Sequence, residues 1–345
     1  MLALFESELL PYRRPPKHPH RQKVGTVIEL FAGAGGLALG LEKAGLKATA
    51  LVEIDRDAVA TLRQNRPQWN VIHGDIKNIS FAGMSADVVT GGFPCQAFSY
   101  AGKSLGLEDT RGTLFYEFAR CVAEVQPKIF LAENVRGLIS HQKGETLQII
   151  LTVLESLGYE VQYRLLNAVN YDVPQKRERV IIVGTRPGMR FFYPQPSPKI
   201  LTLRDALKDV PPSVGIKYSA RKAAVLELVP PGGCWRDLPE DVQKSYMMKN
   251  YYLEGGKTGI ARRISWDEPS LTLTTSPSQK QTERCHPEET RPFTVREYAR
   301  IQTFPDGWEF MGGVGSQYRQ IGNAVPVNFA YHLGRAIGAA LTVNG

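Results

Sequence analysis

The stretch GGFPCQAFS, Gly91 to Ser99, places a cysteine where an apolar, strand-like run ends. Cys95 follows the run Ala86 to Thr90 and stands next to Pro94, which fixes φ beside the thiol. A thiolate is a strong nucleophile even when little of the thiol is ionised, so a rigidly presented cysteine can act as a covalent catalyst. The alternative is a small buried hydrophobic residue, which describes most free cysteines. This stretch alone favours neither reading.

A second candidate for chemistry is Glu133, in the stretch AENVRGL. It comes immediately after an apolar strand-like run, Lys128 to Ala132, so its carboxyl group is expected at the buried end of a strand. Burial disfavours the charged form, which predicts a raised pKa and an acid that can donate a proton or a hydrogen bond at neutral pH. A capping or salt-bridged glutamate is the alternative.

A glycine turn predicts a ligand site of another kind. In TVIELFAGAGGLALGLEKAG an apolar run meets Gly33, Gly35 and Gly36, and a helical pattern follows over Leu37 to Ala44. Such a turn brings backbone N–H groups close to a ligand at a helix N-terminus. The same glycines also fit a dinucleotide motif, which leaves a nicotinamide cofactor open at this point.

Acidic residues follow the next two strand-like segments. Glu53 closes the segment ATALVE about 20 residues after the turn, where an acid reaches a ribose hydroxyl. Asp75 follows the segment Asn70 to His73, where it can meet an adenine amine. Helix-like stretches alternate with these strands, and the rhythm predicts an open, mostly parallel α/β sheet. Ligands bind beyond the carboxyl ends of the strands in such sheets, which is where these acids, Cys95 and Glu133 fall.

Two further features surround the candidate cysteine. The glycine-containing loop Gln96 to Gly112 is predicted to close over a substrate, with an ordinary surface loop as the alternative. In VPQKRERVIIVG, Arg177 and Arg179 alternate on entering a strand, so both side chains are expected on one face, where they can clamp a phosphate or a base carbonyl. A solvated strand edge is the alternative for this pair.

Composition limits the classes of protein that need be considered. The 345 residues carry 42 Lys and Arg against 34 Asp and Glu, a net charge of +8 that favours a polyanionic partner. The four cysteines lack C-x-x-C spacing, so neither a zinc site nor a disulfide framework is predicted. No apolar run reaches the length of a membrane span, so we expect a soluble, cytoplasmic protein. Residues 1–24 are predicted to form a basic, flexible arm.

Six motifs in order make the chain resemble the DNA (cytosine-5) methyltransferases of bacterial restriction-modification systems. The motifs are ELFAGAGG, GGFPCQ, ENV, QKRER, TVREYARIQTFP and GNAVP, and the resemblance runs from about Val27 to Asn328. It implies a Rossmann-like methyltransferase sheet with a second, smaller target-recognition domain. The helix-like segment Val327 to Leu341 is expected to pack back on the first strand and helix.

The resemblance implies a cofactor, S-adenosylmethionine, which becomes S-adenosylhomocysteine as it gives up its methyl group. Glu53 would bind the ribose, with Asp75 and Ile76 at the adenine. The other residues implied for this pocket are Phe31, Gly33, Gly35, Leu37, Ile54, Pro94, Leu114, Asn323 and Val325.

The resemblance also assigns catalytic roles. Cys95 would add to carbon 6 of a flipped-out cytosine, and Glu133 would stabilise protonation at ring nitrogen 3. Arg177 and Arg179 would hold the base carbonyl and its backbone, while Asn134 would orient the cysteine loop. Gln96 and Ser99 of that loop would contact the DNA.

Target recognition is expected between the QKRER and REYARIQ blocks. The predicted division is a catalytic and cofactor-binding domain over residues 25–198, a target-recognition domain over 199–290, and a return to the catalytic domain over 291–345. Arg and Gln side chains read base edges in the major groove. The residues predicted to contact DNA here are Arg262, Arg263, Thr272, Leu273, Gln279, Lys280, Gln281 and Arg284.

The expected partner is double-stranded DNA, bound by a monomer without a metal ion. A cognate restriction endonuclease is expected only as a genetic partner. Two competing hypotheses are an RNA methyltransferase on the same scaffold, which the sizeable variable region disfavours, and a catalytically silent DNA-binding protein, which the filled catalytic positions disfavour. The order of the later motifs has no place for a nicotinamide enzyme.

Overall fold

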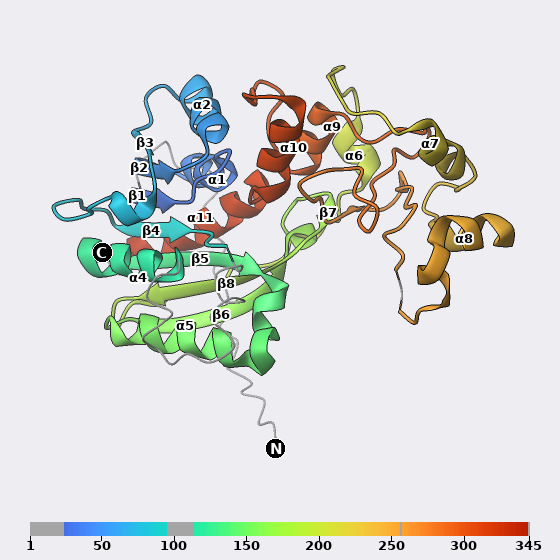
Figure 1. Ribbon diagram of the computed structural model, residues 1–345. Helices are drawn as coiled ribbons and strands as arrows, with labels where there is room; N and C mark the ends of the chain where they lie inside the picture. Colours follow the sequence, from blue (N-terminus) through green and yellow to red (C-terminus); the bar gives the residue numbers. More distant parts are fainter. Residues whose placement is uncertain (1–23, 95–113, 256, 344–345) are drawn as a thin grey trace.

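The computed structural model describes residues 24–94, 114–255 and 257–343. At its centre is a seven-stranded sheet with the strand order β3-β2-β1-β4-β5-β8-β6 (Figure 1). In this sheet the two strand pairs that include β8 are antiparallel and the other pairs are parallel. The predicted open, mostly parallel α/β sheet is confirmed. Its strands are β1 (Gly25–Leu30), β2 (Leu46–Glu53), β3 (Val71–His73), β4 (Val88–Gly91), β5 (Ile129–Val135), β6 (Glu160–Asn167) and β8 (Glu178–Thr185).

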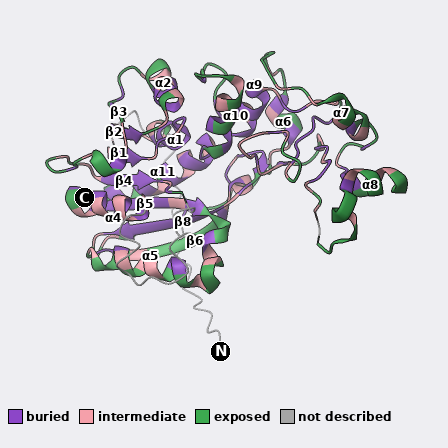
Figure 2. Cartoon of the chain, in the orientation of Figure 1, coloured by how far each residue is buried: buried purple, intermediate pink, exposed green. Residues whose placement is uncertain are grey.

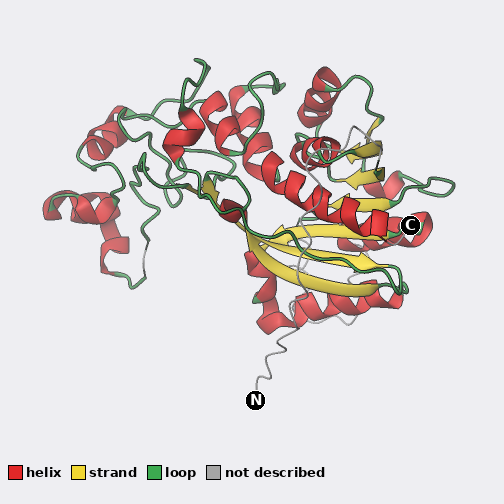
Figure 3. Cartoon of the chain, turned by 180° about the vertical axis from the view of Figure 1, so that it is seen from behind, coloured by secondary structure: helices red, strands yellow, loops and turns green. Residues whose placement is uncertain are grey.

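Helices cover both faces of the sheet. Helices α1 (Gly36–Lys43) and α11 (Val327–Val343) pack on one face, and α4 (Leu114–Val125) and α5 (Glu145–Ser156) pack on the other. Figure 3 shows α11 running across the sheet when the molecule is seen from behind. Strands covered on both faces need apolar residues at successive positions, and all four residues of β4 are buried (Figure 2).

The C-terminal helix lies directly on the first helix. A Cβ added at Gly40 of α1 would lie 2.3 Å from the Cβ of Ala330, and one at Gly334 of α11 would lie 2.7 Å from the Cβ of Ala44. Glycine at both positions therefore lets the two helices approach closely. The return of the chain to its first strand and helix is observed as the sequence predicts.

The rest of the chain forms a smaller lobe, on the right of Figure 1, and the segments that join it to the sheet. Part of the predicted target-recognition region has an apolar cluster of its own around Leu226, Trp235, Met247 and Ile260. The boundaries of that region stay a prediction. The elements here and around the sheet are α2 (Arg56–Asn65), α6 (Leu203–Leu207), α7 (Ala220–Glu227), α8 (Glu240–Met247), α9 (Val295–Ile301), α10 (Val314–Asn323), β7 (Gln175–Lys176) and β9 (Ser270–Leu271). Short 3-10 helices are η1 (Ile76–Asn78), η3 (Arg136–Ile139), η4 (His141–Gly144), η5 (Ala168–Asn170), η6 (Trp235–Asp237) and η7 (Met248–Tyr252).

Two boundaries differ from the sequence-based expectation. Glu133 lies inside β5 and not after it, because pairing with β8 continues as far as Val135 opposite Arg179. Arg177 lies between β7 and β8, so only Arg179 belongs to the long strand. Of the predicted basic arm, only Val24 falls within the described residues, and its N–H donates to the carbonyl of Gly45 at 3.1 Å.

Candidate active site

The glycine turn after β1 is shaped by a carboxylate from the next strand. Glu53, the last residue of β2, accepts hydrogen bonds from the N–H of Gly33 at 2.7 Å, of Ile54 at 2.9 Å and of Asp55 at 2.7 Å. A Cβ added at Gly33, whose φ is +54°, would meet open space. The structure therefore presents a buried carboxylate at the edge of an open, backbone-lined turn.

Apolar and acidic groups stand next to this turn. Ile54 is 62% exposed, although its neighbours along β2 are buried. Asp75 accepts from the N–H of Lys77 at 3.0 Å, and Ile76 beside it is buried in the core. Just beyond β2 and β3, Ile54 therefore offers an exposed apolar side chain and Asp75 a carboxylate.

The remaining predicted cofactor residues divide between core and surface. Gly35, the residue before α1, is in the left-handed conformation with φ +82°, and Phe31 before the turn has φ +56°. Leu37 and Val325 are buried, Phe31 and Leu114 are half-buried, and Pro94 and Asn323 are exposed. The return segment lies against the turn, because a Cβ at Gly36 would lie 2.2 Å from the carbonyl oxygen of Val325. The glycine turn and the return segment, which are distant in the sequence, therefore lie together.

A buried ion pair occupies the carboxyl ends of β4 and β5. Arg179 Nε lies 2.5 Å from Glu133 Oε1, and these two side chains are only 11% and 13% exposed. A Cβ added at Gly92 would lie 2.8 Å from Glu133 Oε2, so the glycine lets the chain entering the cysteine loop pass close to the carboxylate. The guanidinium fixes the position of the Glu133 carboxylate, and the structure therefore shows the salt-bridged glutamate that the sequence left as an alternative.

The neighbouring asparagine is bonded to the same loop. The side-chain amide of Asn134 donates to the carbonyl of Phe93 at 3.0 Å, and its oxygen accepts from the N–H of Val135 at 2.8 Å. Asn134 is buried, so it fixes the backbone two residues before the candidate nucleophile. Cys95 itself lies outside the described residues, as do Gln96, Ser99 and the predicted lid.

Arg177 has a different environment from Arg179, contrary to the expectation that both arginines clamp the base. Its guanidinium is buried and donates to the carbonyls of Leu273 at 3.1 Å, Gly322 at 3.0 Å and Ala324 at 3.1 Å. Burial, and then the positive charge of Arg179, lower the pKa of Arg177 to about 9. Because its terminal nitrogens donate to backbone carbonyls, Arg177 links segments of the protein to one another and does not face a substrate.

Two of the predicted base-reading residues are also buried. Arg263 donates to the carbonyls of Leu226 and Val229, each at 2.7 Å, and Arg284 donates to the carbonyl of Thr272 at 2.7 Å. These arginines are used inside the smaller lobe, which corrects the expectation that they face DNA. A buried guanidinium must be hydrogen-bonded, and backbone carbonyls meet that need here.

The other residues predicted to contact DNA are placed differently. Gln279, Lys280 and Gln281 are exposed on one loop, and Arg262 is half-buried. Leu273 is buried, and the hydroxyl of Thr272 donates to the carbonyl of Lys176 at 2.7 Å. The loop 279–281 therefore offers the most accessible side chains of the predicted set.

A buried acid in the central sheet was not among the predicted site residues. Glu29 of β1 is 2% exposed, its Oε2 has no hydrogen-bond partner among the described residues, and burial raises its pKa to about 8, assisted by the charge of Glu53. Thr90, directly opposite on β4, also has a buried hydroxyl that lacks a partner within the described ranges. An acid at an interior position of the apolar run TVIEL was the available signal.

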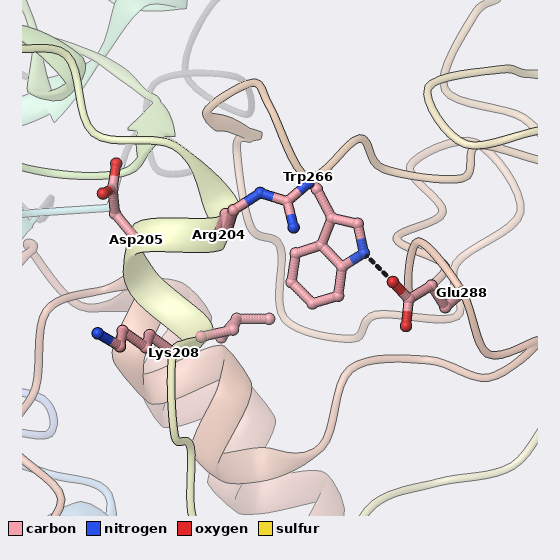
Figure 4. Close-up of a pocket in the computed structure, with 6 residues that line it drawn as sticks. Arg204, Asp205, Lys208, Trp266 and Glu288 are labelled. Carbon is pink, nitrogen blue, oxygen red and sulfur yellow. Dashed lines mark hydrogen bonds between the residues drawn. The ribbon is translucent and has the colours of Figure 1, made fainter.

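A surface cavity of about 430 Å³ lies away from the strand ends (Figure 4). Trp266 forms part of its wall and donates to Glu288 at 2.7 Å, while Arg204 stacks on the indole and pairs with Asp267 at 2.9 Å. Asp205 accepts from the N–H of Thr202 at 2.9 Å. These polar groups satisfy one another, so the cavity is not a candidate catalytic centre.

A membrane-spanning helix and a metal-binding cluster are both absent from the part of the chain that the structure describes. No helix there is long and apolar enough to cross a membrane. Within the same ranges, no cluster of three or more His, Cys, Asp or Glu side chains could hold a metal ion.

The fold and the site define the class of protein. The mostly parallel sheet with helices on both faces is that of the Rossmann-like methyltransferases. Residues 25–339 match the family model described as C-5 cytosine-specific DNA methylase, and the chain belongs to this family.

Relatives of known type are similar over most of the chain. Type II methyltransferase M.Eco47II of Escherichia coli is 62% identical over 328 residues, which are 91% of this chain and 79% of that protein. Type II methyltransferase M.Sau96I of Staphylococcus aureus is 57% identical over 328 residues, 92% of this chain and 76% of that protein. The S. pombe Dnmt2 methyltransferase structure, at 18% identity, has a TM-score of 0.60 over 93% of this chain and 99% of its own and shows the fold alone.

Proposed function

We propose that this protein transfers a methyl group from S-adenosylmethionine to carbon 5 of a cytosine at a specific site in duplex DNA. The observation that carries the proposal is the Glu133–Arg179 ion pair beside the loop that leads to Cys95, in a chain of the C-5 cytosine-specific DNA methylase family. The relatives named above are type II methyltransferases, which supports a role in protecting host DNA in a restriction-modification system. A monomer in the cytoplasm, with a cognate endonuclease only as a genetic partner, fits this role.

The residues around the glycine turn fit S-adenosylmethionine. Open space beside Gly33 leaves room for the ligand, the Glu53 carboxylate stands where a ribose would lie, and exposed Ile54 can cover an adenine face. When bound, the cofactor supplies an electrophilic methyl group on a sulfonium. Asn323 and Val325 would close the pocket from the return segment.

The proposed chemistry depends on making carbon 5 of cytosine nucleophilic. The Cys95 thiolate adds to carbon 6 of the base. Ring nitrogen 3 is protonated during this attack and draws the displaced electron density, and Glu133 stabilises the protonated nitrogen. Arg179 holds the Glu133 carboxyl in place, and its role in the proposal is also to contact the base carbonyl. Carbon 5 then takes the methyl group and loses its proton to a base, Cys95 departs as a thiolate, and ring nitrogen 3 gives up its proton. The product is 5-methylcytosine and the ring regains its aromaticity.

The target base must leave the helix for this chemistry. Flipping a nucleotide out of duplex DNA costs a few kcal/mol in stacking and pairing. Contacts from the smaller lobe to the DNA can offset this cost. We propose the exposed loop Gln279, Lys280 and Gln281 as the main source of such contacts, with Arg262 in support.

Replacement of Cys95 by alanine tests the covalent step. The variant is expected to lose methyl transfer to duplex DNA because carbon 6 has no nucleophile, and to bind S-adenosylmethionine with unchanged affinity. Transfer of a labelled methyl group and calorimetric titration of the cofactor measure the two properties. Cys121→Ala, at a cysteine buried in α4, is the matched control and should stay active. Methyl transfer retained by the Cys95→Ala variant would contradict the covalent mechanism.

A further inference from the structure

The buried guanidinium of Arg177 joins two segments that are far apart in the sequence. One nitrogen donates to Leu273, which lies beside β9 in the predicted target-recognition region. The other donates to Gly322 and Ala324, which flank Asn323 of the predicted cofactor pocket. A single planar group therefore holds both segments in one geometry.

A second connection runs parallel to the first through two glutamines. Gln175 accepts from the N–H of Leu273 at 2.9 Å and donates to the side-chain oxygen of Gln302 at 2.7 Å. Gln302 in turn donates to the carbonyls of Ile321 at 2.7 Å and Ala324 at 3.0 Å. Both backbone groups of Leu273 are thus connected to the return segment, one through Arg177 and one through the glutamines.

The two segments also touch directly. A Cβ added at Gly322 would lie 2.1 Å from the carbonyl oxygen of Thr274, so no side chain separates the two backbones. The hydroxyl of Tyr298 donates to that carbonyl at 2.9 Å and accepts from the N–H of Thr274 at 3.2 Å. Gln175, Gln302 and Tyr298 are fully buried, so this set of hydrogen bonds is protected from water and well defined.

We propose that Gln175, Arg177, Gln302 and Tyr298 form a joint that sets the position of the target-recognition region relative to the cofactor pocket. These four are positioning residues: they act through the backbones of residues 273–274 and 321–324. The inference rests on the proposed function, since the joint matters for catalysis only if one segment serves DNA and the other the cofactor. Methyl transfer needs the base and the methyl donor in line, and a misplacement of about 1 Å costs about 100-fold in rate.

Gln302→Glu is the variant that tests the joint. It keeps the shape of the side chain but removes the donor to Ile321 and Ala324 and places oxygens against two carbonyls. We expect kcat for duplex DNA, measured with both substrates saturating, to fall about 10- to 100-fold. Cofactor affinity should stay within about threefold, because contact with α1 at Gly36 still supports the return segment. Gln317→Glu, the same change on α10 where the amide bonds only to Gly312, should behave as the wild type.

Tyr298→Phe is a milder second variant in case Gln302→Glu does not fold. It removes one hydroxyl from the joint and keeps the ring, so kcat should fall in the same direction by a smaller factor. An unchanged kcat in the folded variants would overturn the proposal. The proposal would also be overturned if kcat and cofactor binding both fell by the unfolded fraction of the variant, because such a result indicates a role in stability only. A wild-type protein that transfers no methyl group to DNA would instead contradict the proposed function.

Discussion

Glu133→Gln is expected to slow methyl transfer by a factor of about 100 to 10,000, the usual contribution of a positioned acid. Glutamine has the shape of glutamate, and its carbonyl oxygen can still accept from Arg179, so the site keeps its geometry. It cannot carry the proton that stabilises attack at the base. Single-turnover transfer of labelled methyl groups measures the effect, and calorimetry should show unchanged cofactor affinity.

The matched control for this variant is Glu178→Gln. Glu178 lies on the neighbouring strand, next to Arg179, and its carboxylate pairs with Arg136 at 2.8 Å on a more exposed surface. The same chemical change there should leave the rate within about twofold of the wild type, because surface ion pairs contribute little. A Glu133→Gln enzyme as fast as this control would remove Glu133 from the proposed mechanism.

Glu29→Gln is expected to stabilise the protein increasingly as the pH rises from about 5 to 8. Burial raises the pKa of Glu29 from 4.5 to about 8, so between these values the folded chain binds one proton more than the unfolded chain. The contribution of protonated Glu29 to the free energy of unfolding is therefore fully present below pH 4.5. It is lost as the pH rises from 4.5 through about 8, by about 1 kcal/mol per pH unit. Glutamine has no such titration, and the gain at pH 7 is on the order of 3 kcal/mol.

Chemical denaturation of both proteins at pH 5, 7 and 8.5 checks this prediction. Glu155→Gln, at an exposed position of α5, is the control for replacing a glutamate by glutamine. The difference in the free energy of unfolding between Glu29→Gln and the wild type should grow with pH. A difference that is constant across this range would show that Glu29 does not take up a proton on folding.

The fold and the central part of the site could be predicted because their signals are local. A β-rich run, a glycine turn and a helix are read from adjacent residues, and Glu53 has the spacing that places it at the turn. Glu133 and Asn134 follow for the same reason, since they sit at the end of one strand. The antiparallel position of β8, which extends β5 past Glu133, depends on a pairing between segments about 50 residues apart and has no local signal.

The arginines show where sequence reasoning stops. Arg177, Arg263 and Arg284 are of the type that binds bases and phosphates, and nothing nearby distinguishes them from Arg179. Their roles are decided by backbone carbonyls that the fold brings from distant segments, such as Leu273 and Gly322 for Arg177. A buried guanidinium with such partners serves the protein interior. Gln302 and Gln175 were missed for the same reason.

Transfer of labelled methyl groups from S-adenosylmethionine to unmethylated duplex DNA, followed by bisulfite sequencing, is the decisive experiment for the proposed activity. The proposed activity predicts incorporation into the duplex, with 5-methylcytosine confined to one short sequence. Transfer RNA should take up no label under the same conditions. Cofactor binding without any incorporation into DNA, or equal labelling of the RNA, would contradict it.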